Sequence, residues 1–487
     1  MTDFIEAQTT AGRVRGFWRG GSAAFLGIPF AEPPIGELRF AAPVPHRAWD
    51  GVRDALEQGA TPQRGNGEIT LIPEPSVEGE STLNVNVFTP APATGGAGLP
   101  VLVYIHGGGY FSGSPASPWY DGAAFNRDGV VTVSIGYRLG FDGFGWIKDA
   151  PHNRGVRDWL LALEWVRDNI ANFGGDPSRV TIAGQSAGGG AVFTLLGMPA
   201  AQSLFHSVYA ISGALSALTL DAAKDLAQKV AADLGVEPTR AALSGLSEEQ
   251  ILKAQNKATG MEGGLAGGDP MEMLNGMIND GLKLGPVIDG ELIPVSTLEA
   301  IRSGIGGDKP LVLGTTDDEF SMIFAEAKNK LRWIPANFLL GKLGLRGSTR
   351  SAYRAANRNV KGTADILGRY VSDKMFRVAA MSVADARGEA PTWMYRFAWR
   401  SPVSGFAGHC LDVPFFFDCL SLDRVAVIAG DNPPQSLADE VHGDAVAFVR
   451  DGDPGWPRYT DGNAVRVFDL QSKTESNGTA AVRSLAV

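Results

Sequence analysis

The chain has 487 residues, of which 44% are hydrophobic and 20% charged, values that are ordinary for a globular protein with a sizeable core. Its net charge of −10 leaves no basic footprint of the kind that nucleic-acid or anionic-membrane partners require. No apolar stretch reaches the roughly 18 residues that span a bilayer, no signal peptide is visible, and the only cysteines are Cys410 and Cys419. These features predict a reduced, cytoplasmic protein.

The N-terminal part is expected to form strands and loops. Gln8–Phe17 and Ala23–Ile28 are strand-like runs around a glycine turn, which predicts an edge hairpin. The proline-rich segment Gly27–Phe40 should then run extended. Residues 63–79 lack periodicity and are expected to form a long loop, whereas Thr82–Phe88 alternates like a strand.

A buried strand and a glycine turn come next. Leu99–Ile105 is a continuous apolar run of the kind found in parallel sheets, and His-Gly-Gly-Gly follows it at 106–109. Successive glycines leave backbone N–H groups unshielded, and a segment of this type supplies part of the oxyanion hole in lipases and esterases. A merely flexible turn is the alternative.

The middle of the chain alternates strands with helices. Val130–Ile135 predicts a buried strand, and Arg157–Ile170 an amphipathic helix that ends at Phe173–Pro177. This rhythm indicates parallel crossovers and therefore an α/β sheet.

The most informative motif is Gly184-Gln185-Ser186-Ala187-Gly188, between a β-branched strand and a small-residue helix. It matches the nucleophile elbow, G-x-S-x-G. A serine is lifted off a strand end only by a turn so tight that the residues two before and two after it must lack side chains. The first N–H groups of the following helix would face the same place and stabilise an oxyanion. A glycine-rich turn with an incidental serine is the alternative.

Some predicted helices do not belong to this alternation of strands and helices, and we expect them to form a cap over the sheet. Asp221–Gly235 and Ser247–Ala258 read as helices, and Gly260–Gly276 as a loose connection. We therefore expect one domain, residues 1–487, with helical cap insertions at about 215–305 and 325–390.

The sheet resumes after the first cap segment. Strands are predicted at Pro310–Gly314, Thr392–Phe397 and Val465–Phe468, and a helix at Ser436–Arg450. An acidic cluster, 317–319, directly follows the first of these strands, where the acid of a catalytic triad belongs in this fold class. A plain acidic turn is the alternative.

Six histidines compete for the role of general base. His409 alone lies in a glycine-flanked loop after a strand, downstream of both the serine and the acid, which matches the chain order of this class. The others lie in surface loops, in the glycine turn or at helices: His46, His106, His152, His206 and His442. A metal site is disfavoured, because His409-Cys410 with Asp412 lacks the usual spacing of zinc ligands.

Together these motifs resemble the type-B carboxylesterases of the α/β-hydrolase superfamily, which include bacterial para-nitrobenzyl esterases and cholinesterases. The matching stretches cover nearly the whole chain: Phe25–Phe40, 106–109, Asn153–Gly155, Phe173–Pro177, 184–188, Gly285–Gly290, Gly314–Glu319 and His409–Phe415. The resemblance implies an α/β-hydrolase fold with a large, mostly parallel central sheet, flanking helices and helical cap insertions.

By this resemblance the catalytic triad is Ser186, Glu319 and His409. Glu319 is chosen over Asp317 and Asp318 because the family's Asp-Glu pair matches Asp318-Glu319. The implied activity is that of a serine carboxylesterase that hydrolyses small-molecule esters through an acyl-enzyme, with no metal or organic cofactor and no nucleic-acid or membrane partner, as a monomer or weak homo-oligomer.

The resemblance also assigns supporting groups. The oxyanion donors are the N–H groups of Gly108, Gly109 and Ala187, and Ser212 supports the acid by hydrogen bonding. One departure concerns 80–83, which read Glu-Ser-Thr-Leu where the family has Glu-Asp-Cys-Leu, so the family's disulfide cysteine is missing and the loop before it is untied.

Two alternative functions stay open at this point. An amidase or carbamate hydrolase would use the same triad, and a non-catalytic binding or adhesion relative is disfavoured because every triad position is filled.

The position of the aromatic residues beside the motifs also stays open. They either line an apolar pocket or belong to the core: Tyr110, Phe111, Trp119, Phe320 and Phe324.

Overall fold

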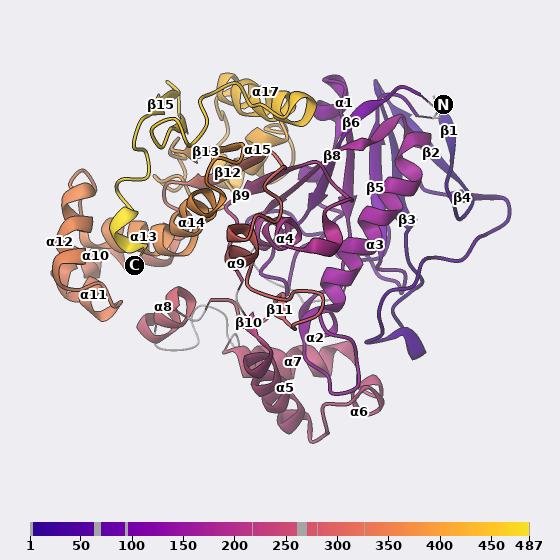
Figure 1. The fold of residues 1–487 in the computed structure, drawn as a ribbon, viewed down its shortest axis with the longest axis horizontal. Coiled ribbons are helices and arrows are strands. Elements are labelled where there is room, and N and C mark those ends of the chain that lie inside the picture. Colours follow the sequence, from indigo (N-terminus) through magenta and orange to yellow (C-terminus); the bar gives the residue numbers. More distant parts are fainter. Residues whose placement is uncertain are drawn as a thin grey trace.

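The computed structural model describes residues 3–62, 70–92, 96–216, 218–260, 270–279, 281–325 and 327–486. Within these ranges its centre is a 13-stranded sheet of order β1-β2-β3-β5-β7-β6-β8-β9-β12-β13-β14-β15, with β4 paired to β2 (Figure 1). The strands are β1 (Phe4–Gln8), β2 (Arg13–Arg19), β3 (Ser22–Pro29), β4 (Val52–Asp54), β5 (Asn84–Thr89), β6 (Leu99–Ile105), β7 (Val131–Ile135), β8 (Gly175–Gln185), β9 (Ser207–Ile211), β12 (Leu311–Thr316), β13 (Thr392–Phe397), β14 (Val465–Phe468) and β15 (Lys473–Glu475). A separate short pair joins β10 (Leu218–Thr219) to β11 (Val287–Ile288).

Helices surround this sheet. They are α1 (Ala123–Arg127), α2 (Gly140–Phe144), α3 (Arg154–Asn169), α4 (Ala187–Leu196), α5 (Leu220–Leu234), α6 (Arg240–Ser244), α7 (Glu248–Thr259), α8 (Pro270–Asn279), α9 (Thr297–Arg302), α10 (Lys328–Leu331), α11 (Ala336–Lys342), α12 (Gly347–Ala356), α13 (Thr363–Ser372), α14 (Val378–Arg387), α15 (Val413–Phe416), α16 (Val425–Ala429) and α17 (Gln435–Asp451). In the described part of the chain, none is long and apolar enough to cross a membrane.

The central strands, from β7 to β14, run parallel. Towards both edges the strands pair antiparallel, apart from the parallel pair of β2 and β4. The register aligns the ends of neighbouring strands, because Ile105 pairs with Gly184, and Ile211 pairs with both Gln185 and Gly314. The loops that follow β6, β8, β9 and β12 therefore leave the sheet at one edge, which is where ligands bind in open parallel sheets.

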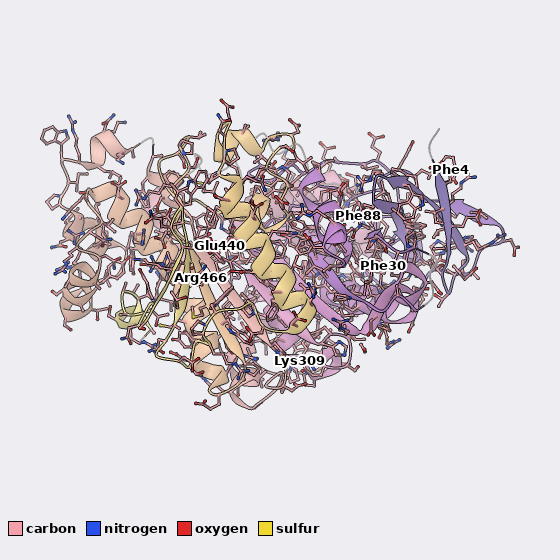
Figure 2. The ribbon with its side chains drawn as sticks, turned by 90° about the horizontal axis from the view of Figure 1, so that it is seen from above. Phe4, Phe30, Phe88, Lys309, Glu440 and Arg466 are labelled. Atoms are coloured by element: carbon pink, nitrogen blue, oxygen red, sulfur yellow. The ribbon has the colours of Figure 1, made fainter. Side chains whose placement is uncertain are left out.

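Alternate residues of the central strands face two different helical layers. Val103 of β6 belongs to the core cluster that includes Trp159 of α3, whereas Tyr104 packs in the cluster that includes Phe416 of α15. This two-sided burial explains why the central strands read as continuous apolar runs. Helix α17 covers β6 and β8 on the second face, and its Glu440 forms an ion pair with Arg466 of β14 (Figure 2).

Two helical groups extend beyond the sheet (Figure 1). Helices α5, α6 and α7 form one of them, and α10 to α13 form the other, at the end of the molecule far from the N-terminal strands. Helix α9 lies between these groups in sequence and α14 follows the second group, but the two helices pack against each other, with α9 on α4 and α14 on β12 and β13. They therefore belong to the layers that flank the sheet.

Most of the predicted strands and helices are confirmed, and three differences have a physical reason. The first run, Gln8–Phe17, is interrupted at 9–12, where the Thr9 hydroxyl accepts from the Gly12 N–H and closes a turn between β1 and β2. The short strand β9 was missed, and it forms by pairing with β8 on one side and β12 on the other. Part of the expected loose connection is helical, because α8 begins at Pro270.

The expected loop at 63–79 is confirmed for residues 70–79, which form neither helix nor strand; residues 63–69 lie outside the described part of the chain.

Candidate active site

The turn between β8 and α4 holds Ser186 in a strained backbone conformation. Ser186 has φ 59° and ψ −118°, which L-residues rarely adopt. The turn tolerates no side chain at its flanks: a Cβ on Gly188 would lie 2.0 Å from the Ile105 carbonyl oxygen, and one on Gly184 would lie 2.4 Å from the Gly188 backbone. These clashes confirm the steric reason given for the elbow, and the turn leaves Ser186 partly accessible to solvent.

The glycine turn after β6 lies directly against Ser186. A Cβ on Gly107 would lie 3.2 Å from the Ser186 Cβ, and Gly108 and Gly109 have positive φ values of 105° and 63°. Among the described residues, the N–H groups of Gly108 and Gly109 donate to no protein acceptor. The N–H of Ala187, the first residue of α4, likewise lacks an intrahelical acceptor. Three free donors therefore surround the serine.

Glu319 and His409 meet in the loops after β12 and β13. The Nδ1 atom of His409 lies 2.6 Å from Glu319 Oε2. The backbone N–H of His409 donates to the Glu319 carbonyl at 2.9 Å. The other carboxylate oxygen of Glu319 accepts from the Ser212 hydroxyl at 2.7 Å and from the Thr316 N–H at 2.8 Å. Glu319 is fully buried, so these hydrogen bonds satisfy a carboxylate that water does not reach.

The two neighbouring aspartates point elsewhere. Asp317 contacts Arg396, Arg377 and Arg369 at 2.8, 3.2 and 3.5 Å. Burial works to raise the pKa of Asp317, but these guanidinium groups hold it well below its ordinary value. Asp318 pairs with Arg369 at 3.0 Å. Both aspartates are therefore neutralised by arginines and lie apart from the imidazole.

The second imidazole nitrogen is occupied by a residue that the sequence analysis did not single out. His409 Nε2 lies 3.1 Å from the side-chain nitrogen of Gln185. Since Nδ1 faces a carboxylate, Nδ1 carries the proton, and Nε2 accepts from the Gln185 amide. Within the described residues, Ser186 makes no hydrogen bond to His409. Gln185 immediately precedes the serine in the elbow, and that position is the signal that would have found it.

Charged and aromatic groups set the environment of His409. Burial works to lower its pKa, but Cys410 and the Glu319 carboxylate raise it, and the pKa lies well above its ordinary value. Burial and the nearby Glu319 also raise the pKa of Asp412 to about 7. Its Oδ2 accepts from the Tyr395 hydroxyl at 3.0 Å.

The aromatic residues near the motifs divide into two groups. Phe320 packs on the His409 ring with the centroids 5.0 Å apart, and Phe376 does so at 5.1 Å. Phe376 carried no sequence signal, because it comes from a segment far from every motif. Tyr110 and Trp119 are fully buried and belong to the core, as does Phe324. Phe111, like Phe320, is partly exposed.

The described part of the loop at 70–79 packs on the glycine turn. Glu74 Oε2 accepts from the Gly113 N–H at 2.9 Å, and the Ser114 hydroxyl donates to the Pro75 carbonyl at 2.8 Å. The loop therefore supports the turn that carries the free N–H donors.

The elbow serine, the free backbone donors and the His409–Glu319 pair at the carboxyl edge of a parallel sheet define a serine-dependent α/β hydrolase. The model of the carboxylesterase family matches residues 3–483. The chain belongs to this family, and it is a serine hydrolase that acts on carboxylic esters.

Individual relatives agree over nearly the full length. The chain is 32% identical to the para-nitrobenzyl esterase of Bacillus subtilis over 471 residues, covering 93% of this chain and 92% of the relative. It is 33% identical to the phenmedipham hydrolase of Pseudarthrobacter oxydans over 488 residues, covering 93% and 92%. A solved carboxylesterase structure from Geobacillus stearothermophilus superimposes with a TM-score of 0.84 at 32% identity, covering 99% of this chain and 100% of that one.

Proposed function

We propose that Ser186 is the nucleophile of this esterase, His409 its general base and Glu319 the acid that orients the imidazole. His409 takes the proton of Ser186 as the serine oxygen attacks the ester carbonyl. Glu319 holds the proton on Nδ1 and stabilises the imidazolium. The protonated imidazole then gives its proton to the leaving alcohol. Water attacks the acyl-enzyme in the second half, with His409 again as base, and no metal or organic cofactor takes part.

The N–H groups of Gly108, Gly109 and Ala187 are proposed to bind the oxyanion of the tetrahedral intermediate. Their support is that all three are free of protein acceptors and surround Ser186. Ser212 is proposed to fix the carboxylate, since its hydroxyl donates to the Glu319 oxygen that does not face the imidazole.

The single observation that carries this proposal is the chain of hydrogen bonds from Ser212 through Glu319 to His409, which ends beside the elbow serine. Of the ion pairs His409–Glu319, His46–Glu32 and His442–Asp128, only the first has a fully buried carboxylate.

The substrate class is tested with para-nitrophenyl esters of increasing acyl length alongside matched 4-nitroanilides and para-nitrophenyl carbamates. Esters should be turned over and anilides should be slower by about three orders of magnitude, because the amine is a far poorer leaving group than the phenolate. Carbamate turnover reports how the pocket accepts a nitrogen beside the carbonyl. Comparable rates on anilides and esters would favour an amidase instead.

Gln185 offers a more specific test. Gln185→Glu places a carboxylate at His409 Nε2, which stabilises the imidazolium, so the midpoint of the kcat/KM–pH profile should move up by about one pH unit. Gln185→Met has nearly the same shape without hydrogen-bonding groups and should produce no upward shift. The profile is measured with a para-nitrophenyl ester across neutral and alkaline pH. Identical midpoints in both variants and the wild type would contradict the contact.

We further propose that the groups α5–α7 and α10–α13 are cap insertions on one catalytic domain, and that the protein works in the cytoplasm as a monomer or weak homo-oligomer. The support for the location is that both cysteines are free and buried, as expected in a reducing compartment. Nucleic acid is not among the proposed partners.

A further inference from the structure

One stretch of the chain departs sharply from its overall acidity. Residues 327–362, here called the basic lobe, contain nine of the 43 lysines and arginines and none of the 53 acidic residues. The lobe comprises α10, α11 and α12, which protrude at one end of the molecule in both views (Figures 1 and 2). The net charge of −10 is therefore an average that conceals a strongly cationic end.

The cations of the lobe are largely available for a partner. Among the described residues, Lys328 is the only one of the nine that pairs with a carboxylate, that of Asp365 at 3.0 Å. Arg350 and Arg346 instead donate to backbone carbonyls within the lobe, at 2.8 and 3.2 Å. The positive field of this end is thus not cancelled locally.

Large apolar side chains stand among these charges. Trp333 is 76% exposed, Phe338 58% and Ile334 36%, although the lobe has a core of its own in which leucines such as Leu340 are fully buried against α13. The exposed rings are therefore not left over from an incomplete core. Within the described residues they stay exposed to solvent beside cations of the lobe.

Cations of the lobe lie over both exposed rings. The guanidinium of Arg332 lies 4.7 Å from the centre of the Trp333 ring, and the ammonium of Lys342 lies 5.8 Å from that of Phe338. Cations around an exposed tryptophan and other apolar side chains match the interface of a bilayer, where rings enter the headgroup boundary and cations meet anionic lipids.

We propose that the basic lobe docks the protein reversibly onto an anionic lipid surface. Attachment is peripheral, which agrees with a cytoplasmic protein because the cytoplasmic leaflet carries the anionic lipids. The lobe is also joined to the catalytic edge, since Arg369 of the adjoining α13 pairs with Asp318, the residue before Glu319. The inference does not depend on the catalytic assignment, and its test does not use turnover as the readout.

The test is cosedimentation of the full-length protein with vesicles of phosphatidylglycerol and phosphatidylcholine in equal parts. We expect binding to these vesicles at low salt, little binding to pure phosphatidylcholine, and release at high salt, because exposed charges are screened. Lys330→Glu/Arg332→Glu should weaken partition by more than about ten-fold, since each cation near the surface contributes about five-fold. Trp333→Ala/Phe338→Ala should weaken it by about ten-fold through lost apolar burial.

Matched controls replace similar residues outside the lobe. Val403→Ala/Val427→Ala removes other exposed apolar groups, which are 58% and 61% exposed, and Arg47→Glu reverses a cation far from the lobe in sequence. These controls should bind vesicles like the wild type. Every variant should retain its turnover of a soluble ester, which shows that it is folded.

Several results would overturn the proposal. One is the absence of binding to the anionic vesicles at low salt, and another is equal binding by the lobe variants and the wild type. A third is lobe-dependent binding of polyglutamate or duplex DNA without binding of vesicles, which would assign the surface to an acidic protein or a nucleic acid.

Discussion

Ser186→Ala is expected to lower kcat on a para-nitrophenyl ester by about 10⁵-fold, close to 7 kcal/mol of transition-state stabilisation. The loss is this large because no neighbouring group replaces the hydroxyl that the elbow presents. KM should change little, since the methyl group leaves the pocket and the N–H donors intact. The measurement is steady-state hydrolysis, together with labelling by an ester phosphonate followed by peptide mass spectrometry.

Ser117→Ala is a suitable control. Ser117 is buried, unlike Ser186, and its hydroxyl has no hydrogen-bond partner among the described residues. This variant should retain wild-type turnover and take up the phosphonate on Ser186. If Ser186→Ala kept more than a few per cent of the activity, or if the label resided elsewhere, the assignment of the nucleophile would be wrong.

Glu319→Gln is expected to lower kcat by about 10³- to 10⁴-fold and to change its pH dependence. His409 must be neutral to accept the serine proton, so activity rises with pH through the pKa of His409. Because that pKa is raised, the wild-type midpoint should lie above the usual histidine value of about 6.5. Removing the Glu319 charge removes one cause of the raised pKa, so the midpoint of kcat/KM should move to lower pH.

Asp318→Asn makes the same chemical change one residue earlier. Asp318 pairs with Arg369 and does not contact the imidazole, so this variant should lose stability while its pH midpoint stays at the wild-type value. If Asp318→Asn shifted the midpoint and Glu319→Gln did not, the acid would have been assigned to the wrong carboxylate.

Local patterns predicted most elements of the fold. Leu99–Ile105 and Thr392–Phe397 were predicted with the boundaries that the structure has, because strands buried on both faces are mostly apolar. Ser207–Ile211 was missed, since so short a segment becomes a strand only through pairing with β8 and β12. The helix that begins at Pro270 was missed because it lies in a stretch rich in glycine and methionine, a composition that predicts a loose connection.

The residues of the candidate site likewise fall into those that local patterns predict and those that only the fold brings together. The elbow and the glycine turn are local devices, because the steric limits at Gly184, Gly188 and Gly108 depend on residues close in sequence or on one paired strand. Phe376 could not be predicted, because it reaches His409 through the folding of a distant segment.

By itself, the sequence determined where a serine must be lifted from a strand and which histidine and acidic cluster follow it in order. It did so because tight turns restrict which residues fit. The tertiary structure decided which carboxylate meets the imidazole: arginines from α13, the segment 373–377 and β13 bind the two aspartates and leave Glu319 for His409. It also decided that the side chain of Gln185 contacts Nε2 of His409. The contacts of Glu319 and Gln185 with His409 both depend on distances between segments that are far apart in the sequence, and no local pattern encodes such distances.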